Sequence, residues 1–474
     1  MTTNAHQRPQ LYSLVVVFFF WGFVAASNGI FIPFCKAHFS LSQFQSQLID
    51  FTFYGGYFIG SILLFILSRI FKTDLLNKIG YKKGIIYGLL ISVVGALSII
   101  PSVNEGSFQL ILCSFFIVAL GFSLQQTASN PYVVALGSSD TGAHRLNLAG
   151  GVNSFGTTIG PIIVSYVLFG SLQNANAANT SIGSIKELYL IMAGIFAAMA
   201  LFFTFSKLPN VKNDEIVETG FGALKYPQLV LGMVAIFMYV GVEVTIQSNM
   251  GALLKLPDFG GYDEAHISQF ISLYWGSLMI GRWTGAISVF RLNKTAKMFA
   301  FILVPYFAFM IILFVNYLHG NDLNELFVYA FCVALLIIAN FIGKEKQART
   351  LMVFALFGLA AMLVGLMSTG KIALYSFISG GLFCSVMWPC IFSLAISGLG
   401  KHTSQGSAFL IMMILGGAII PPLQGKLADS SLGIHASYII TLFCFAYLAF
   451  FALRARSILK QQGIDEDKVS ATAH

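Results

Sequence analysis

Two acidic side chains stand where such groups are costly. Asp50, in QSQLIDFTFYGGYF, and Glu243, in MYVGVEVTIQSN, are the two of 19 Asp and Glu residues that fall inside apolar segments of membrane length. A carboxylate at bilayer depth costs about 2.5–3.5 kcal/mol on insertion scales. A residue kept at that cost usually faces a polar cavity or a partner. We therefore expect both acids to take part in coupling to a cation, and Glu243 also to bind substrate.

Amides and aromatic side chains accompany the two acids. Asn28 is expected at the depth of Asp50 in the adjacent helix, and the pair would suit a sodium ion if sodium is the coupling ion. Gln247 lies four residues after Glu243, so the two share a helix face. Amides and aromatic faces together suit a neutral polyol, although each could instead serve helix packing. The other candidate substrate ligands are Gln126, Asn130, Asn153, Tyr274, Trp275 and Trp388.

The composition requires a membrane protein. The chain is 57% hydrophobic and 10% charged, with a mean hydropathy of +0.80, far from the range of soluble domains. An outer-membrane barrel would show apolar and polar residues alternating with a period of two, and this chain does not. The expected fold class is therefore an all-α integral membrane protein. The six Cys lack metal-ligand spacing and the eight His lie outside the spans or at their ends, so no metal cofactor is predicted. We expect no enzyme activity.

Runs of about 20 apolar residues predict fourteen spans, with uncertain boundaries. Of the 27 Lys and Arg residues, 21 fall in connections and tails on one side, five fall on the other, and Arg282 lies within a span. The positive-inside rule then places both termini in the cytoplasm. For Arg282 we expect an anchor that snorkels to the inner membrane surface. The predicted spans are 12–34, 44–70, 83–101, 108–135, 145–170, 187–206, 227–254, 265–289, 296–318, 323–343, 349–369, 372–397, 404–425 and 434–453.

The most polar internal connection divides the chain into two helical halves. We expect an N-terminal half of six spans at 1–206, a cytoplasmic linker at 207–226, a C-terminal half of eight spans at 227–455 and a cytoplasmic tail at 456–474. Such parallel halves are how major facilitator transporters are built, with substrate held between them at mid-depth. Twelve helices complete that design. The two extra helices are expected within 296–369.

Several segments resemble one family of bacterial transporters. They are GFSLQQTASNPYVVALG (121–137), RLNLAGGVNSFGTTIGP (145–161), YVGVEVTIQS (239–248), LYWGSLMIGRWTG (273–285), WPCIFSLAISGLG (388–400) and GSAFLIMMILGGAIIPPLQG (406–425). The chain is similar to the fucose permease and glucose/galactose transporter family of the major facilitator superfamily. The resemblance implies that a proton or sodium gradient drives monosaccharide uptake by alternating access. It also implies that Asn28 and Asn153 contact sugar and that Glu243 is the acid typical of the glucose/galactose branch.

The chain departs from the family pattern at four positions. Gly29 stands where members commonly carry Asp, and Gly150 where they carry Gln. Gln126 replaces the Glu of the fucose permeases, as in the glucose/galactose branch. Asp50 stands where Gln is more common. We hypothesise that the acid of the first span has been relocated to Asp50 in the neighbouring helix.

The sequence thus favours a secondary active transporter that imports a hexose, deoxyhexose or amino sugar by proton or sodium symport. An uncoupled sugar facilitator and a membrane sugar sensor are the alternatives. The expected partners are a small-molecule sugar and the lipid bilayer, with no nucleic acid. We expect the protein to work as a monomer in a bacterial inner membrane.

Overall fold

The structure is a computed structural model that describes a large part of the chain. The described residues are 8–70, 76, 79–136, 142–169, 183–210, 222–287, 292–318, 320, 322–344, 346–399 and 402–464. Every regular element within these ranges is a helix.

The first half of the chain forms one helical bundle. Its helices are α1 (Arg8–Phe39), α2 (Gln43–Ser46), α3 (Leu48–Ile70), α5 (Tyr81–Asn104), α6 (Phe108–Ala135), α7 (Gly142–Phe169) and α8 (Gly183–Phe205).

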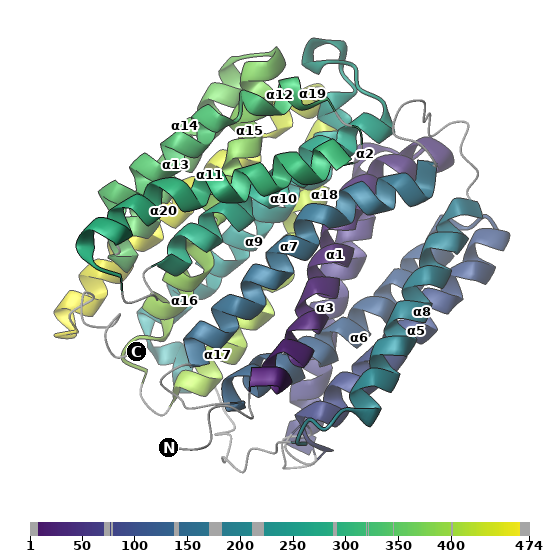
Figure 1. Cartoon of the computed structure of the whole chain (residues 1–474), viewed down its shortest axis with the longest axis horizontal. Coiled ribbons are helices and arrows are strands. Elements are labelled where there is room, and N and C mark those ends of the chain that lie inside the picture. Colours follow the sequence, from purple (N-terminus) through teal and green to yellow (C-terminus); the bar gives the residue numbers. More distant parts are fainter. Residues whose placement is uncertain are drawn as a thin grey trace.

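The second half forms a larger bundle beside the first (Figure 1). Its α-helices are α9 (Pro227–Leu254), α10 (Glu264–Ala286), α11 (Lys294–Leu318), α12 (Leu323–Phe327), α13 (Ala330–Gly343), α14 (Gln347–Met367), α15 (Gly370–Cys384), α16 (Met387–Ile396), α17 (Thr403–Met412), α18 (Gly416–Ala428), α19 (Gly433–Ser437) and α20 (Ile439–Gln461). Short 3-10 turns add η3 (Gly222–Lys225), η4 (Pro257–Phe259) and η7 (Met413–Leu415).

The helices are long enough to cross a bilayer. Within the described residues, 12 helical segments are long and apolar enough to do so. α3 and α10, of 23 residues each, are two further long helices of the bundle. The all-helical, multi-pass fold expected from composition is therefore confirmed, with about fourteen long helices.

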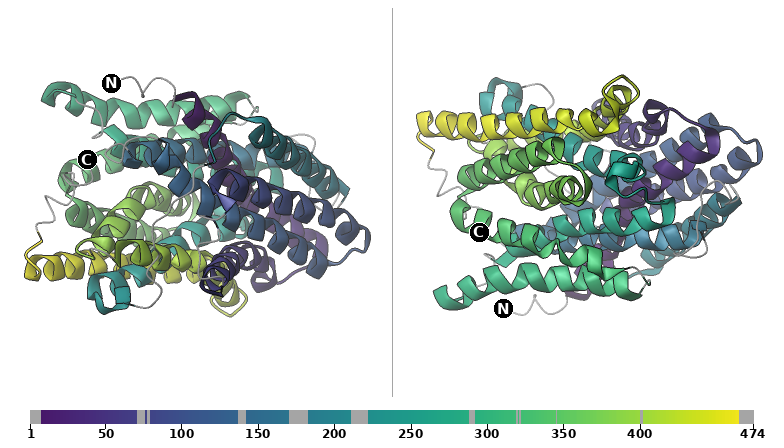
Figure 2. Two further views of the ribbon diagram at one scale, coloured as in Figure 1. Left: turned by 90° about the horizontal axis from the view of Figure 1, so that it is seen from below. Right: turned by 90° about the horizontal axis from the view of Figure 1, so that it is seen from above.

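The two bundles lie side by side with their helix axes running in a common direction, as two further views also show (Figure 2). α1 begins and α20 ends at the same end of the molecule (Figure 1). We call this the terminal end. The opposite end, where α2 lies between α1 and α3, we call the α2 end.

The two halves repeat one packing pattern, which identifies the extra helices. In the first half α5 packs on α6 and α8, and in the second half α14 packs in the same way on α15 and α20. Likewise α1 packs on α7 as α9 packs on α18. In this comparison α11 and α13 have no counterpart. We therefore assign the extra pair to them.

The extra pair is fastened to α10. Ile312 of α11 fills the space left by Gly276, where a Cβ atom would lie 2.5 Å from the Cδ1 atom of Ile312. The hydroxyls of Ser277 and Tyr329, both buried, lie 2.7 Å apart and share a hydrogen bond. These contacts join the extra helices to the helix that carries Tyr274 and Trp275.

A polar cluster at the α2 end adds a second attachment. The Lys371 ammonium lies 3.0 Å from Oε1 of Glu325 in an ion pair. The Tyr262 hydroxyl donates to the same carboxylate at 2.9–3.0 Å. Burial, reinforced by the hydrogen bond with Glu325, raises the pKa of the Tyr262 phenol, which remains a neutral donor. The extra pair is thus held to the second half from two sides.

Three predicted spans are interrupted rather than continuous. The span 44–70 divides at Gln47 into α2 and α3, and a capping box of Ser42 and Gln45 marks the start of α2. The span 372–397 divides at Ser385 and Val386, between α15 and α16, because Pro389 has no N–H to donate to the carbonyl of Ser385, four residues earlier. The span 404–425 contains the 3-10 turn η7. Asp50 consequently lies in the first turn of α3 and not a turn and a half inside a helix.

Candidate functional site

Asp50 joins the two halves of the molecule. Its side chain is fully buried. The Nδ2 of Asn28 on α1 donates to Oδ1 of Asp50 at 2.9 Å. From the other half, the hydroxyl of Ser248 on α9 donates to Oδ2 of Asp50. The structure thus brings Asn28 and Asp50 together as the sequence predicts, while their part in cation coupling stays a prediction.

Two glutamine amides complete the surroundings of Ser248. Nε2 of Gln247 donates to the Ser248 hydroxyl oxygen at 2.9 Å, and Nε2 of Gln47 donates to the Ser248 carbonyl at 3.2 Å. Both glutamines are fully buried. The Oε1 atom of each has no hydrogen-bond partner within the described part of the chain. Gln247, predicted as a substrate ligand, therefore lies in the group around Asp50.

Gly29 makes room for Gln247. A Cβ atom at position 29 would lie 2.3 Å from Oε1 of Gln247 and 2.8 Å from Cγ2 of Ile271. A larger side chain fits here only if the side chains of Gln247 and Ile271, both of the other half, are displaced. The acid that the family resemblance implies at position 29 is therefore absent, and Gly29 instead contacts the other half. Asp50, which binds the neighbouring Asn28, is the acid beside this contact.

Further hydrogen bonds between halves close the α2 end. Nε2 of Gln43 donates to Oδ1 of Asn249 at 2.8 Å. The Asp429 carboxylate, at the end of α18, accepts from the backbone N–H groups of Gln43 and Phe44 at 2.8 Å each. Because α2 belongs to the first half and α9 and α18 to the second, these contacts hold the halves together here.

A cavity of about 270 Å³ lies beside this closure, between α1, α2 and α9. Along α9 it extends from Lys255 through Ala252 to Ser248, the residue whose hydroxyl donates to Asp50. Its lining residues are Ile32, Pro33, Lys36, Ala37, Leu41, Gln43, Ser248, Ala252 and Lys255.

Glu243 occupies a second polar group nearer the middle of α9. Oε1 of Glu243 accepts from the Tyr239 hydroxyl at 2.8 Å and from Nη2 of Arg282 at 3.2 Å. Nη1 of Arg282 donates to the hydroxyl of Ser154 on α7 at 2.8 Å. Arg282 thus links the carboxylate of one half to a helix of the other.

The expectation that Arg282 snorkels to the membrane surface is wrong. Its guanidinium forms an ion pair with Glu243, and its side chain is only 28% exposed. An unpaired carboxylate at this depth is far costlier than a paired one, so the two charges are found together. The interior of this site is therefore net neutral.

Aromatic side chains of the second half lie around the Glu243 group. The Tyr274 hydroxyl donates to the Glu243 carbonyl at 2.6 Å. Trp275 is buried, and its Nε1 has no hydrogen-bond partner among the described residues. The ring of Trp388 lies 6.0 Å from that of Tyr239, centroid to centroid. Of the three aromatic residues predicted for the site, Tyr274 thus contacts Glu243 directly, whereas Trp275 lies beside Tyr274 and Trp388 beside Tyr239.

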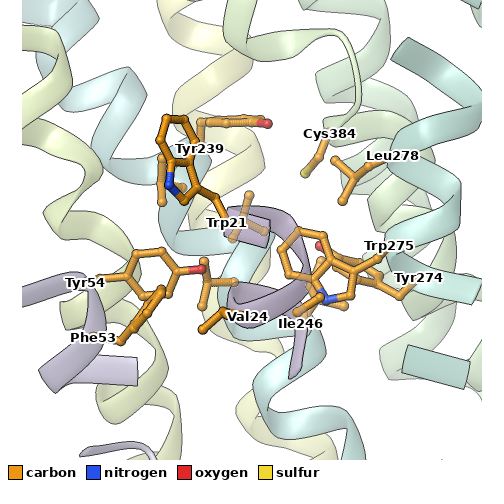
Figure 3. Close-up of a cluster of buried hydrophobic side chains, with 14 of the residues drawn as sticks. Trp21, Val24, Phe53, Tyr54, Tyr239, Ile246, Tyr274, Trp275, Leu278 and Cys384 are labelled. Atoms are coloured by element: carbon orange, nitrogen blue, oxygen red, sulfur yellow. The ribbon is translucent and has the colours of Figure 1, made fainter. Parts of the chain in front are cut away.

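The close-up shows a buried cluster of aromatic and aliphatic side chains drawn from both halves (Figure 3). Side chains of α3 lie on one side of it and those of α10 on the other, and the Tyr54 hydroxyl points into the space between them. Tyr54 packs on the glycine at 417, where a Cβ atom would lie 3.0 Å from its ring. The labelled residues are Trp21, Val24, Phe53, Tyr54, Tyr239, Ile246, Tyr274, Trp275, Leu278 and Cys384.

The remaining predicted ligands make contacts within the first half. Nε2 of Gln126 donates to the Tyr57 hydroxyl at 3.4 Å. Nδ2 of Asn153 donates to the Phe18 carbonyl at 2.9 Å and thereby links α7 to α1. The side chain of Asn130 lies outside the described residues.

Sequence reasoning missed five residues of the two polar groups. Tyr239 carried a usable signal, because it lies four residues before Glu243 on the same helix face. The other four act across the interface between halves, and no spacing along the sequence reports such contacts; they are Gln47, Ser154, Ser248 and Arg282. They could be found only from the fold.

Comparison with known proteins defines the class of the molecule. Residues 13–343 match the Major Facilitator Superfamily. A "Glucose/galactose transporter" of Brucella abortus is 34% identical over 94% of this chain and 93% of its own length. An "L-fucose-proton symporter" of Escherichia coli is 26% identical over 93% of this chain and 91% of its own. The chain belongs to the fucose permease and glucose/galactose transporter family of the major facilitator superfamily.

Solved structures show the same fold. The chain matches the E. coli transporter FucP, crystallised in the outward conformation, with a TM-score of 0.63 and 25% identity over 94% of this chain and 98% of that one. It matches a bacterial Spinster homologue in the inward-facing, unoccupied conformation with a TM-score of 0.60 at 13% identity, over 96% and 98% of the two chains. The major facilitator fold expected from the sequence is confirmed.

Proposed function

We propose that the protein imports a monosaccharide by cation symport, through alternating access of its two halves. The names of the relatives support a hexose or a deoxyhexose as substrate. The site supports this class, because hydroxyl groups both donate and accept hydrogen bonds and sugar rings pack on aromatic faces.

The observation that carries the proposal is the unpaired, buried Trp275 indole, which lies beside Tyr274, the residue whose hydroxyl binds the Glu243 carbonyl. A buried donor without a partner costs free energy unless a ligand or water accepts from it. One sugar hydroxyl can accept from Nε1 of Trp275 while another donates to the Glu243 carboxylate. Trp388 supplies aromatic surface beside Tyr239, whose hydroxyl donates to the Glu243 carboxylate.

The two acids take different roles in this proposal. The charge of Glu243 is balanced by Arg282, so this carboxylate is suited to hold substrate while remaining ionised. Asp50 has two neutral partners, Asn28 and Ser248, within the described residues. We assign coupling to Asp50 and sugar binding to Glu243.

We assign the α2 end to the outside of an inner membrane, with the terminal end in the cytoplasm. The excess of Lys and Arg in the connections at the terminal end supports this orientation. The hydrogen bonds of Asp50, Gln43 and Asp429 then form an outer gate, and the structure represents a state in which that gate is closed.

Uptake into proteoliposomes tests this function. A panel of labelled D-glucose, D-galactose, L-fucose and N-acetylglucosamine is offered under an imposed sodium gradient or an imposed proton gradient. We expect one sugar to accumulate above equilibrium under one of the gradients. Equilibration without accumulation under both would instead identify an uncoupled facilitator.

A further inference from the structure

We propose that Asp50, Asn28, Ser248, Gln47 and Gln247 form a sodium site that spans the two halves and is complete only when the α2 end is closed. The inference rests on the proposed function, because sodium would be its coupling ion. It goes further in naming the ion, the five ligand residues and the conformation that binds.

Charge is the first argument. Asp50 is fully buried, and its partners among the described residues are neutral. Its place in the first turn of α3 lets the helix dipole stabilise the ionised carboxylate. A buried carboxylate needs a compensating charge. A monovalent cation restores neutrality, whereas a divalent ion would leave an excess positive charge.

Unsatisfied oxygens are the second argument. Oε1 of Gln47 and Oε1 of Gln247 are both buried without a donor. The Nε2 group of each glutamine donates to Ser248, which is also the residue that contacts Asp50. The two unpaired oxygens therefore belong to amides that are held next to Ser248. A proton on Asp50 adds one donor and can satisfy only one of these oxygens. A cation is coordinated by several carboxylate, amide and hydroxyl oxygens at once, which is the donor set that hard cations prefer.

The positions of the ligands explain how the ion would couple to movement. Asn28, Gln47 and Asp50 belong to the first half, and Gln247 and Ser248 belong to the second. Opening the α2 end separates the two sets. A ligand that binds one conformation better than another shifts the equilibrium toward it. Sodium therefore stabilises the closed outer gate.

The lysines of the adjacent cavity do not occupy the site. Lys255 lies seven residues beyond Ser248 on α9, about 10 Å along the helix axis. Lys36 donates to Oε1 of Gln43 at 2.6 Å, nearer the α2 end. The carboxylate of Asp50 is thus left for a mobile cation.

Binding of ²²Na⁺ to the purified full-length protein, without sugar, tests the inference. Wild type is compared with Asp50→Asn, Gln47→Leu and Gln247→Leu. The matched control is Gln228→Leu, which removes a fully buried glutamine at the opposite end of α9. Size-exclusion profiles and thermal unfolding confirm that each variant is folded.

We expect saturable ²²Na⁺ binding by wild type and by Gln228→Leu. Asp50→Asn should abolish it, and each of the other two variants should weaken it about tenfold or more, because a lost ligand costs at least as much as a lost group that orients one. Absence of saturable binding by folded wild type, or wild-type binding by Asp50→Asn, would overturn the site. Sugar accumulation driven only by protons would overturn it too, while leaving the proposed symport intact. Accumulation in neither gradient would refute the symport itself.

Discussion

At the scale of single residues, the two intramembrane acids differ in what balances their charge. Glu243 has the guanidinium of Arg282 at 3.2 Å, whereas Asp50 has hydrogen bonds from Asn28 and Ser248. A paired acid keeps its charge through a transport cycle at little cost, and an acid without a cationic partner gains most from binding a cation. The difference makes each acid's role separately testable.

Gly29 offers the sharpest steric test. In Gly29→Ala the new Cβ would lie 2.3 Å from Oε1 of Gln247, so the α2 end could not close without displacing that amide. Overpacking of this kind typically costs about 1–3 kcal/mol. We expect the initial rate of sugar uptake to fall about tenfold or more. Gly55→Ala, which has open space around the new atom, should transport normally. Normal uptake by Gly29→Ala would show that the close contact is not required.

Glu243→Gln separates sugar binding from coupling. We expect it to lose both accumulation and sugar exchange, because the lost carboxylate is the proposed sugar ligand. It should also destabilise the protein by about 3 kcal/mol, since Arg282 is left buried without its partner.

The double variant Glu243→Gln/Arg282→Gln serves as the control. It removes both charges, so thermal stability should largely return while transport stays lost. Exchange retained in the single variant would instead assign Glu243 to coupling.

At the scale of elements, interrupted helices shape the interface between the halves. The α2–α3 break lets Gln47 reach the Ser248 carbonyl and places Asp50 in a first helical turn. The α15–α16 break precedes Trp388. In transporters, discontinuous helices near mid-depth are typical of binding sites, because they leave backbone and side chains free to contact ligands. The α15–α16 break is of this kind, whereas the α2–α3 break lies at the α2 end.

Asp429 fastens α2 to α18 and should control the closed state. Asp429→Ala removes two hydrogen bonds to the start of α2, which should favour the open gate by about 0.5–2 kcal/mol. The measurement is the distance between spin labels at Gln109 and Ser431, exposed positions at the α2 end of each half, with Cys113 replaced by Ser. We expect a longer distance population to grow.

Asp258→Ala removes another exposed acid at the α2 end of the second half and should leave the distance unchanged. An unchanged distribution in Asp429→Ala would mean that the Asp429 contact does not hold the gate.

Most of the helices can be predicted from the sequence, but the contacts between the two halves cannot. Long apolar runs predict the helices, because apolar length is what a bilayer requires of them. Asn28 and Asp50 are expected at a similar depth in neighbouring helices, and this correctly places them side by side. The partners of Arg282 and Ser248 belong to the other half, and their contacts depend on how two bundles dock. That docking has no periodic signal in the chain, which is why Arg282 was expected at the surface.

At the scale of the whole molecule, the two bundles meet through two polar groups separated along α9. The Glu243–Arg282–Ser154 group lies nearer the middle of α9, and the Asp50–Ser248 group lies toward the α2 end. The extra helices α11 and α13 are joined to α10, on the second half. We therefore expect them to move with that half. Alternating access would break and remake the Asp50 group while a sugar stays at the deeper one.

The most direct test of this account compares wild type with Asp50→Asn in proteoliposomes, in two assays with the accepted sugar. One measures accumulation of labelled sugar under the ion gradient, and the other measures exchange of labelled for unlabelled sugar. Asp50→Asn has nearly the same shape as the native residue but carries no charge. We predict that it loses accumulation under the driving ion gradient and retains sugar exchange, because the deeper site around Glu243 is intact. Accumulation equal to that of wild type would contradict the assignment of coupling to Asp50.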